Sequence, residues 1–199
     1  MQNKLIAEGL GTFALALAVL TSLQMQPSPI ATPVVAGLVL ALFVYTIGSK
    51  SGSHINPAVT IGLWSINKIK TNDAVSYIIV QVLGGLIAYG LVSTMSGEGV
   101  MSLGMMPEST SIFLAEAIGS LFFGFGIAAV VYGKVRDDVN GLVIGGSLLL
   151  GILLAAGLGS AGILNPAVAL ALGALNLSYA LGSIIGVMLG MNLYRRFIA

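Results

Sequence analysis

Long apolar stretches separated by short polar segments organise almost the whole chain. A helix that crosses the hydrocarbon core of a bilayer, ~30 Å thick, needs roughly 20 mostly apolar residues. Six stretches meet this requirement and are predicted to be transmembrane helices: 4–24, 31–49, 73–95, 110–133, 139–158 and 177–196. Two shorter apolar pieces, 56–66 and 165–174, cannot span the core. We expect these two to be re-entrant half-helices or interfacial helices.

The basic residues all fall in alternate gaps between these stretches or at the chain ends. The eight of them are Lys4, Lys50, Lys68, Lys70, Lys134, Arg136, Arg195 and Arg196. If the spans alternate in direction, every positive charge lies on one side, which the positive-inside bias assigns to the cytoplasm. The pattern therefore predicts a multi-pass protein of the plasma membrane with both termini cytoplasmic. The first half-helix then enters from the cytoplasm and the second from outside.

Composition supports a membrane location. Hydrophobic residues make up 57% of the chain and charged residues 8%, with a mean hydropathy of +1.03, whereas a soluble domain carries roughly 25% charged residues. The lipid bilayer is therefore its expected surroundings. The absence of cysteine excludes disulfides, thiolate metal ligands and a cysteine nucleophile. A net charge of +1 without a basic cluster predicts no nucleic-acid partner.

The two halves of the chain repeat one another. Residues 7–12 (AEGLGT) reappear as 115–120 (AEAIGS), and Asn-Pro-Ala at 56–58 reappears at 165–167 with nearly the same spacing. Each half holds three spans, so the halves must insert with opposite topology. Inverted repeats with broken helices place a transport path at their interface, near the midplane. We expect one membrane domain over residues 1–199, divided into a first repeat, 1–100, and a second, 101–199.

The repeated tripeptide marks a helix start. Its residues are Asn56, Pro57 and Ala58 in the first copy and Asn165, Pro166 and Ala167 in the second. Asn can cap a helix, and Pro fits the first turn. Two starts that enter from opposite sides would bring two positive dipole ends together, which repels cations and hinders proton hopping. Each Asn would keep amide N–H groups for a passing molecule, and the irregular segments before it would offer carbonyl acceptors.

The sequence around the first copy resembles a known family. Residues 51–60 read SGSHINPAVT, which is similar to the SGxHxNPAVT of the aquaporin, or major intrinsic protein, family. Residues 7–12 and 81–85 also resemble family signatures, and the likeness covers essentially the whole chain. The resemblance implies an all-α membrane protein with six transmembrane helices and two re-entrant half-helices in an inverted repeat. It also implies one pore per subunit and, usually, a homotetramer.

Three ionisable residues lie within apolar segments. Charges inside spans are costly and are usually functional or paired. The resemblance implies that Glu8 and Glu116 brace the re-entrant loops by accepting backbone N–H bonds, a role we favour over ion conduction. His54 lies on the approach to Asn56, where packing and hydrogen bonding or a pore-lining, pH-gating role are both open. A lone His predicts no metal site, and the sequence offers no catalytic set. We therefore expect no cofactor and no enzymatic activity.

The second copy departs from the family pattern at the residue after Ala167. Val168 stands where the family has an Arg that joins three other residues in an outer constriction. The resemblance places those three at Ala36, at Ile152 or Leu153, and at Gly162. This filter is small, apolar and uncharged. A narrow apolar ring dewets and closes, whereas a wide one conducts water and larger neutral solutes, and the sequence leaves both open.

These observations predict a passive channel for water and small neutral solutes, with an apolar, wide filter. A facilitator of glycerol, urea, ammonia or metalloids with little water flux is the first alternative. A non-conducting structural membrane protein of the same fold is the second. An ion channel is disfavoured, because no ring of charged residues lines the expected path.

Overall fold

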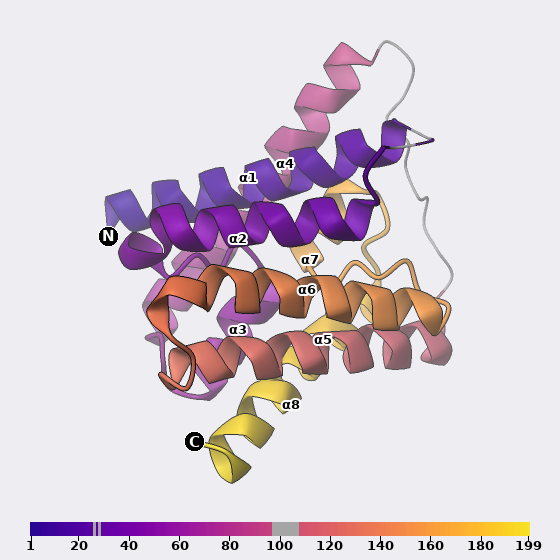
Figure 1. The fold of residues 1–199 in the computed structure, drawn as a ribbon. Coiled ribbons are helices and arrows are strands. Elements are labelled where there is room, and N and C mark those ends of the chain that lie inside the picture. Colours follow the sequence, from indigo (N-terminus) through magenta and orange to yellow (C-terminus); the bar gives the residue numbers. More distant parts are fainter. Residues whose placement is uncertain (26, 28, 97–107) are drawn as a thin grey trace.

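A computed structural model describes the whole chain except residues 26, 28 and 97–107. The described elements follow in chain order: α1 Gln2–Gln24, α2 Thr32–Ser51, α3 Pro57–Ser65, α4 Thr71–Met95, α5 Thr110–Val131, the 3₁₀ helix η1 Asp137–Val139, α6 Asn140–Gly157, α7 Pro166–Ala171 and α8 Leu177–Phe197. Figure 1 shows α1, α2, α5 and α6 running nearly side by side, with α4 and α8 inclined to them.

Within the described residues, 6 helices are long and apolar enough to cross a membrane. They are α1, α2, α4, α5, α8 and α6 together with η1, and they coincide closely with the six predicted spans. Large apolar side chains such as Leu38, Ile87 and Leu150 are exposed on their outer faces, where lipid rather than water can surround them. The prediction of six transmembrane helices is therefore confirmed.

The two predicted half-helices are short helices inside the bundle. The first, α3, packs against α4 and α8, while α7 packs against α1, α4 and α8. The two also contact each other, and Figure 1 shows both enclosed by the longer helices. Proline stands at the first turn of each, where its missing N–H costs no helical hydrogen bond. The fold thus brings the two Asn-Pro-Ala segments to one place.

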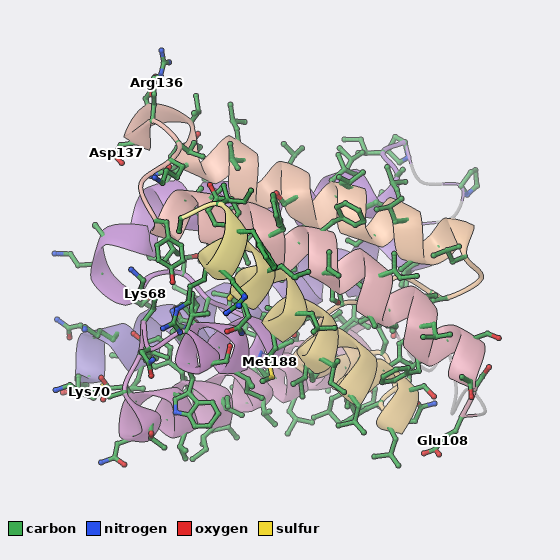
Figure 2. The ribbon with its side chains drawn as sticks, turned by 90° about the horizontal axis from the view of Figure 1, so that it is seen from below. Lys68, Lys70, Glu108, Arg136, Asp137 and Met188 are labelled. Atoms are coloured by element: carbon green, nitrogen blue, oxygen red, sulfur yellow. The ribbon has the colours of Figure 1, made fainter. Side chains whose placement is uncertain are left out.

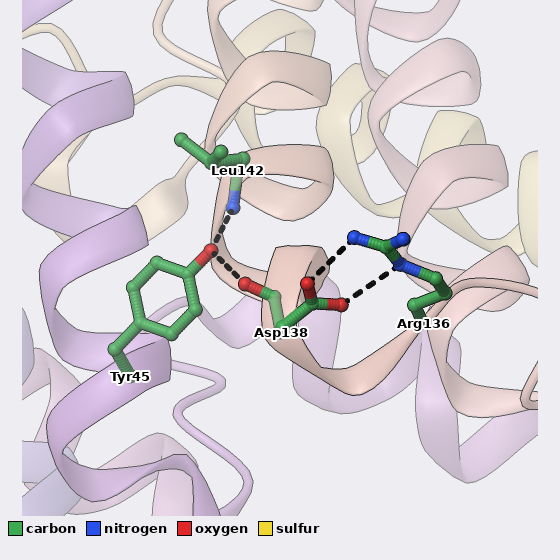
Figure 3. A network of polar contacts seen from close by, with 4 residues as sticks. All are labelled: Tyr45, Arg136, Asp138 and Leu142. Atoms are coloured by element: carbon green, nitrogen blue, oxygen red, sulfur yellow. Dashed lines mark hydrogen bonds and ion pairs between the residues drawn. The ribbon is translucent and has the colours of Figure 1, made fainter.

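The basic loops gather at one end of the bundle. Figure 2 shows Lys68, Lys70 and Arg136 at one end and Glu108 at the other. Near the basic end, Tyr45 of α2 fixes the start of α6: its hydroxyl donates to the Asp138 carbonyl at 3.1 Å and accepts from the Leu142 N–H at 3.2 Å (Figure 3). This tie satisfies a backbone donor in the first turn of α6.

An ion pair in the same network contributes little. The Arg136 guanidinium meets the Asp138 carboxylate at 2.6 Å, but their side chains are 79% and 64% exposed. Pairs as exposed as this contribute about 0–1 kcal/mol. The Tyr45 side chain, rather than this ion pair, joins α2 to α6 here, because the Tyr45 ring packs directly over Gly141.

Glycines allow the helices to cross closely. A Cβ atom on Gly37 of α2 would lie 2.8 Å from the carbonyl oxygen of Gly145 on α6. A Cβ atom on Gly145 would in turn collide with the carbonyl oxygen of Gly37. Small residues at a crossing let two backbones approach, which is how helices associate in lipid without a hydrophobic driving force.

Adjacent glycines on α6 offer a matched test of this crossing. Gly145→Ala is expected to lower the free energy of unfolding by about 1–3 kcal/mol, because α2 and α6 must move apart. Gly146→Ala is expected to leave the free energy of unfolding unchanged or raised, since no described residue lies within 4 Å of a Cβ atom there. The measurement is the unfolding midpoint of both variants in detergent. Equal midpoints would contradict the close crossing.

Candidate pore and its outer constriction

Each half-helix begins at a capping asparagine. The Asn56 Oδ1 atom accepts from the Ala58 N–H at 2.8 Å. The Asn165 Oδ1 atom accepts from the N–H groups of Ala167 at 3.0 Å and Val168 at 3.4 Å. Both side chains are 3% exposed. The caps point the amino ends of α3 and α7, with their positive dipoles, toward the contact between the two half-helices.

The two asparagines are also bonded across the repeat. Asn56 Nδ2 donates to the Leu164 carbonyl at 2.8 Å, and Asn165 Nδ2 donates to the Ile55 carbonyl at 3.1 Å. Each amide therefore reaches the residue that precedes the other asparagine. A side-chain amide has two N–H donors, and within the described residues each of these amides uses one. The second N–H of each amide has no partner among the described residues.

The residues that supply these carbonyls have unusual backbone conformations. The φ angle is 40° at Ile55 and 53° at Leu164. Positive φ is uncommon outside glycine and a true outlier for a β-branched residue such as Ile55. Such strain persists only when surrounding contacts impose it, and it concentrates at functional sites. Here it turns both carbonyls toward the opposite asparagine.

Glu8 braces the first re-entrant loop. Its Oε1 atom accepts from the Ser51 hydroxyl at 2.6 Å and the His54 N–H at 2.9 Å. Its Oε2 atom accepts from the Ile55 N–H at 2.7 Å and from Gln81 Nε2 at 2.9 Å. The carboxylate is fully buried and its oxygens are occupied by donors, which is how a buried charge is made tolerable. These contacts fit the bracing role and leave ion conduction without support.

Glu116 does the same for the second loop with fewer partners. It accepts from the Ser160 hydroxyl, from the Ile163 N–H at 3.0 Å and from the Leu164 N–H at 2.8 Å. The α8 residue that corresponds to Gln81 is Ser183, which is too short to reach and instead donates to the Tyr179 carbonyl at 2.8 Å. The two halves therefore share a plan but differ in how firmly each loop is held.

Sequence reasoning missed the polar residues around His54. His54 Nδ1 lies 3.1 Å from Thr60 Oγ1, and Gln81 Nε2 donates to the same oxygen at 3.0 Å. The ring meets Tyr77 edge-on, with 5.1 Å between centroids. These contacts fit packing and hydrogen bonding, the first of the two roles considered for His54. A buried Gln in an otherwise apolar span was the sequence signal that could have pointed to this network.

A cavity of about 380 Å³ is lined by residues of α1, α2, α6 and α7 and of the loop that precedes α7. Its lining includes Ala36, Ile152, Gly162, Val168 and Asn165. Among the described residues, none that lines it carries a charge. The structure thus brings four of the proposed filter residues into one space.

Leu153 does not line this cavity. Its side chain is 54% exposed, whereas that of Ile152 is 8% exposed. Successive residues of an α-helix point about 100° apart, since about 3.6 residues make a turn, so only one of the pair can face inward. Of the two alternatives for the α6 position, the geometry therefore fits Ile152. Gly162 opposes it: its φ is 66°, and a Cβ atom there would lie 2.7 Å from the Ile152 carbonyl oxygen.

Residues 1–194 match the family model of the major intrinsic proteins. The chain belongs to the major intrinsic protein family. It is 33% identical over 175 residues to nodulin-26 of Glycine max, covering 83% of this chain and 64% of that protein. It is 32% identical over 174 residues to the glycerol uptake facilitator protein-like 6 of Lactiplantibacillus plantarum, covering 83% and 80%. The resemblance drawn from the sequence is confirmed.

A solved structure confirms the fold of this family member. The X-ray structure of the aquaglyceroporin from Plasmodium falciparum superposes with a TM-score of 0.75 at 20% identity, covering 98% of this chain and 96% of that one. The fold is therefore aquaporin-like, and the protein is a multi-pass membrane protein. The chain spans less than two thirds of several curated relatives, including 64% of nodulin-26 and 61% of aquaporin NIP1-1 of Arabidopsis thaliana.

Proposed function

We propose that this major intrinsic protein is a passive channel, and not an enzyme, that conducts water and small neutral solutes through a wide, apolar outer constriction. The observation that carries the proposal is a cavity whose described lining is uncharged and includes Asn165, one of the paired asparagines. A solute would enter between Ala36, Ile152, Gly162 and Val168. It would then exchange its hydration for the free amide N–H groups at the centre.

Charge selection rests on the half-helices. Each helix dipole is equivalent to about half a positive charge at its amino end, and both amino ends face the asparagines. A cation at the centre would meet two like partial charges and amide donors instead of acceptors. A water molecule there would accept from the amides, which orients the water chain against proton transfer. Neutral solutes escape this penalty, so the proposed cargo is uncharged.

The outer cavity has room for more than one water molecule, and the residue at position 168 supports a wide constriction over a closed one. A volume of about 380 Å³ is many times the roughly 30 Å³ that a water molecule occupies in the liquid. Val168 stands where the family has Arg, so no long side chain crosses this space. The name of one similar protein, glycerol uptake facilitator protein-like 6, also supports passage of solutes larger than water.

A facilitator with little water flux is the second candidate, and the apolar lining is the observation that favours it. The discriminating experiment compares purified protein in liposomes under glycerol and impermeant osmotic gradients, followed by light scattering. We expect faster glycerol entry and faster water efflux than in protein-free liposomes. Faster glycerol entry with unchanged water efflux would favour the second candidate. No acceleration in either gradient would contradict both and leave the non-conducting protein.

Assembly, orientation and the boundary of the repeats are also part of the proposal. We infer one channel domain, with repeats 1–100 and 101–199, in a homotetramer of the plasma membrane. The matched order of α1–α4 and α5–α8 supports the repeat, and the basic end shown in Figure 2 supports cytoplasmic termini. Cross-linking in native membranes is expected to give a ladder up to a tetramer. Cross-linking that yields monomers alone would contradict the homotetramer.

A further inference from the structure

A hollow of about 530 Å³ lies where α3 leaves the bundle, outside the candidate pore. It is lined by Trp64, Asn67, Lys68, Ile69, Lys70 and Thr71. These residues form the end of α3, the loop after it and the first residue of α4. Figure 2 places both lysines at the basic end of the molecule. Nothing in the proposed conduction pathway uses this hollow.

Two positive charges at the hollow have no acidic partner among the described residues. Lys68 and Lys70 are exposed, and within the described residues the ion pair recorded within 4.0 Å is that of Arg136 and Asp138. Asp73, in the first turn of α4, is the nearest acidic residue along the chain and is not part of the lining. The Lys68 ammonium instead lies 4.5 Å from the centroid of the Tyr132 ring, which holds it in place without neutralising it.

Along α4, beyond the hollow, the surface becomes apolar. Thr71, Val75 and Ile79 lie four residues apart on one face of α4, and residues at this spacing are neighbours on a helix surface. Val75 is 53% exposed and Ile79 is 55% exposed. Trp64 is 45% exposed, with its indole N–H donating to Thr71 Oγ1 at 3.0 Å. A half-exposed tryptophan of this kind is typical of the level of the lipid headgroups.

We propose that this hollow binds one anionic phospholipid, with its phosphate beside Lys68 and Lys70 and an acyl chain along Val75 and Ile79. The two uncompensated lysines supply the charge complementarity, and the tryptophan sets the depth of the headgroup. The apolar strip distinguishes a lipid from a free phosphate ion, which would use only the lysines. Basic hollows between membrane helices on the positively charged side take such headgroups. The site is independent of whether the pore conducts.

The test is native mass spectrometry of the full chain in detergent, titrated with phosphatidylglycerol or phosphatidylcholine. We expect tighter binding of phosphatidylglycerol. Each lysine near an anionic headgroup contributes about fivefold to the affinity. The double variant Lys68→Gln/Lys70→Gln should therefore weaken the binding of phosphatidylglycerol roughly 25-fold. The matched control, Lys4→Gln/Lys50→Gln, removes the same charge from exposed positions outside the hollow and should keep wild-type affinity.

Two results would overturn the proposal. In the first, both double variants lose the same affinity, so that general charge rather than this hollow attracts the lipid. In the second, inorganic phosphate displaces phosphatidylglycerol at concentrations near the lipid's own dissociation constant, which would make the acyl contact irrelevant. Since the lysines are exposed, the variants are expected to fold, and circular dichroism of each checks this.

Discussion

The variant Val168→Arg is expected to lower glycerol flux relative to water flux by roughly tenfold or more. Val168 faces a cavity that it shares with Ala36 and Ile152, and an arginine side chain there would fill the path of a bulky solute. Each ~1.4 kcal/mol added to a barrier slows passage about tenfold. Water is small enough to pass beside the guanidinium, and it can accept a hydrogen bond from it. Light scattering of liposomes in paired glycerol and impermeant gradients measures the ratio.

Val168→Met is the control for this prediction, because it adds length without charge or donors. We expect it to lower both fluxes, since it narrows an apolar ring without replacing lost hydration. The two variants together separate the effect of width from that of hydrogen bonding. An unchanged flux ratio in Val168→Arg, at equal protein content, would show that Val168 does not lie at the constriction.

The variant Glu8→Ala is expected to cause the largest loss of stability, about 4 kcal/mol or more. The truncation leaves the N–H groups of His54 and Ile55, the Ser51 hydroxyl and the Gln81 amide without their acceptor. Each buried group left unpaired costs about 1–3 kcal/mol. The first re-entrant loop would then lose the contacts that hold Ile55 in its strained conformation. Unfolding in mixed micelles, followed by circular dichroism, gives the free energy.

Glu116→Ala is the matched comparison in the second repeat. It is expected to cost less, because Glu116 accepts from one hydroxyl and two N–H groups and has no amide partner like Gln81. Because the two loops are held by different numbers of hydrogen bonds, we expect a larger loss of unfolding free energy in Glu8→Ala than in Glu116→Ala. A greater loss in Glu116→Ala would mean that the second loop is the more firmly held, contrary to the geometry.

The membrane spans were predictable because the bilayer itself imposes their length. Hydropathy therefore located α1, α2, α4, α5, α6 and α8, and the paired tripeptides located α3 and α7. The α6 residue that belongs to the outer constriction could not be predicted in the same way. A difference of one residue in loop length shifts the match between Ile152 and Leu153, and only packing decides which faces inward. The side-chain exposures of 8% and 54% come from that packing.

The contacts that join the two halves were beyond the sequence. The bond from Asn56 to the Leu164 carbonyl links residues far apart in the chain, and it depends on how two half-helices meet. Gln81 in an apolar span is a sequence signal, but its contacts with Thr60 and His54 could not be predicted, because a repeat comparison shows which positions correspond and not which side chains reach each other. Both features are set by tertiary geometry instead of by local pattern.

The central claim is that water crosses the membrane through the space between the paired asparagines. The most direct test is the osmotic water permeability of liposomes that contain the wild-type protein or Ala36→Trp, whose indole would project into the cavity beside Ile152 and Val168 and narrow it. We predict that the wild-type protein raises permeability well above that of protein-free liposomes, and that Ala36→Trp lowers it toward that baseline. A wild-type permeability equal to the baseline, or one that the tryptophan leaves unchanged, would contradict the account.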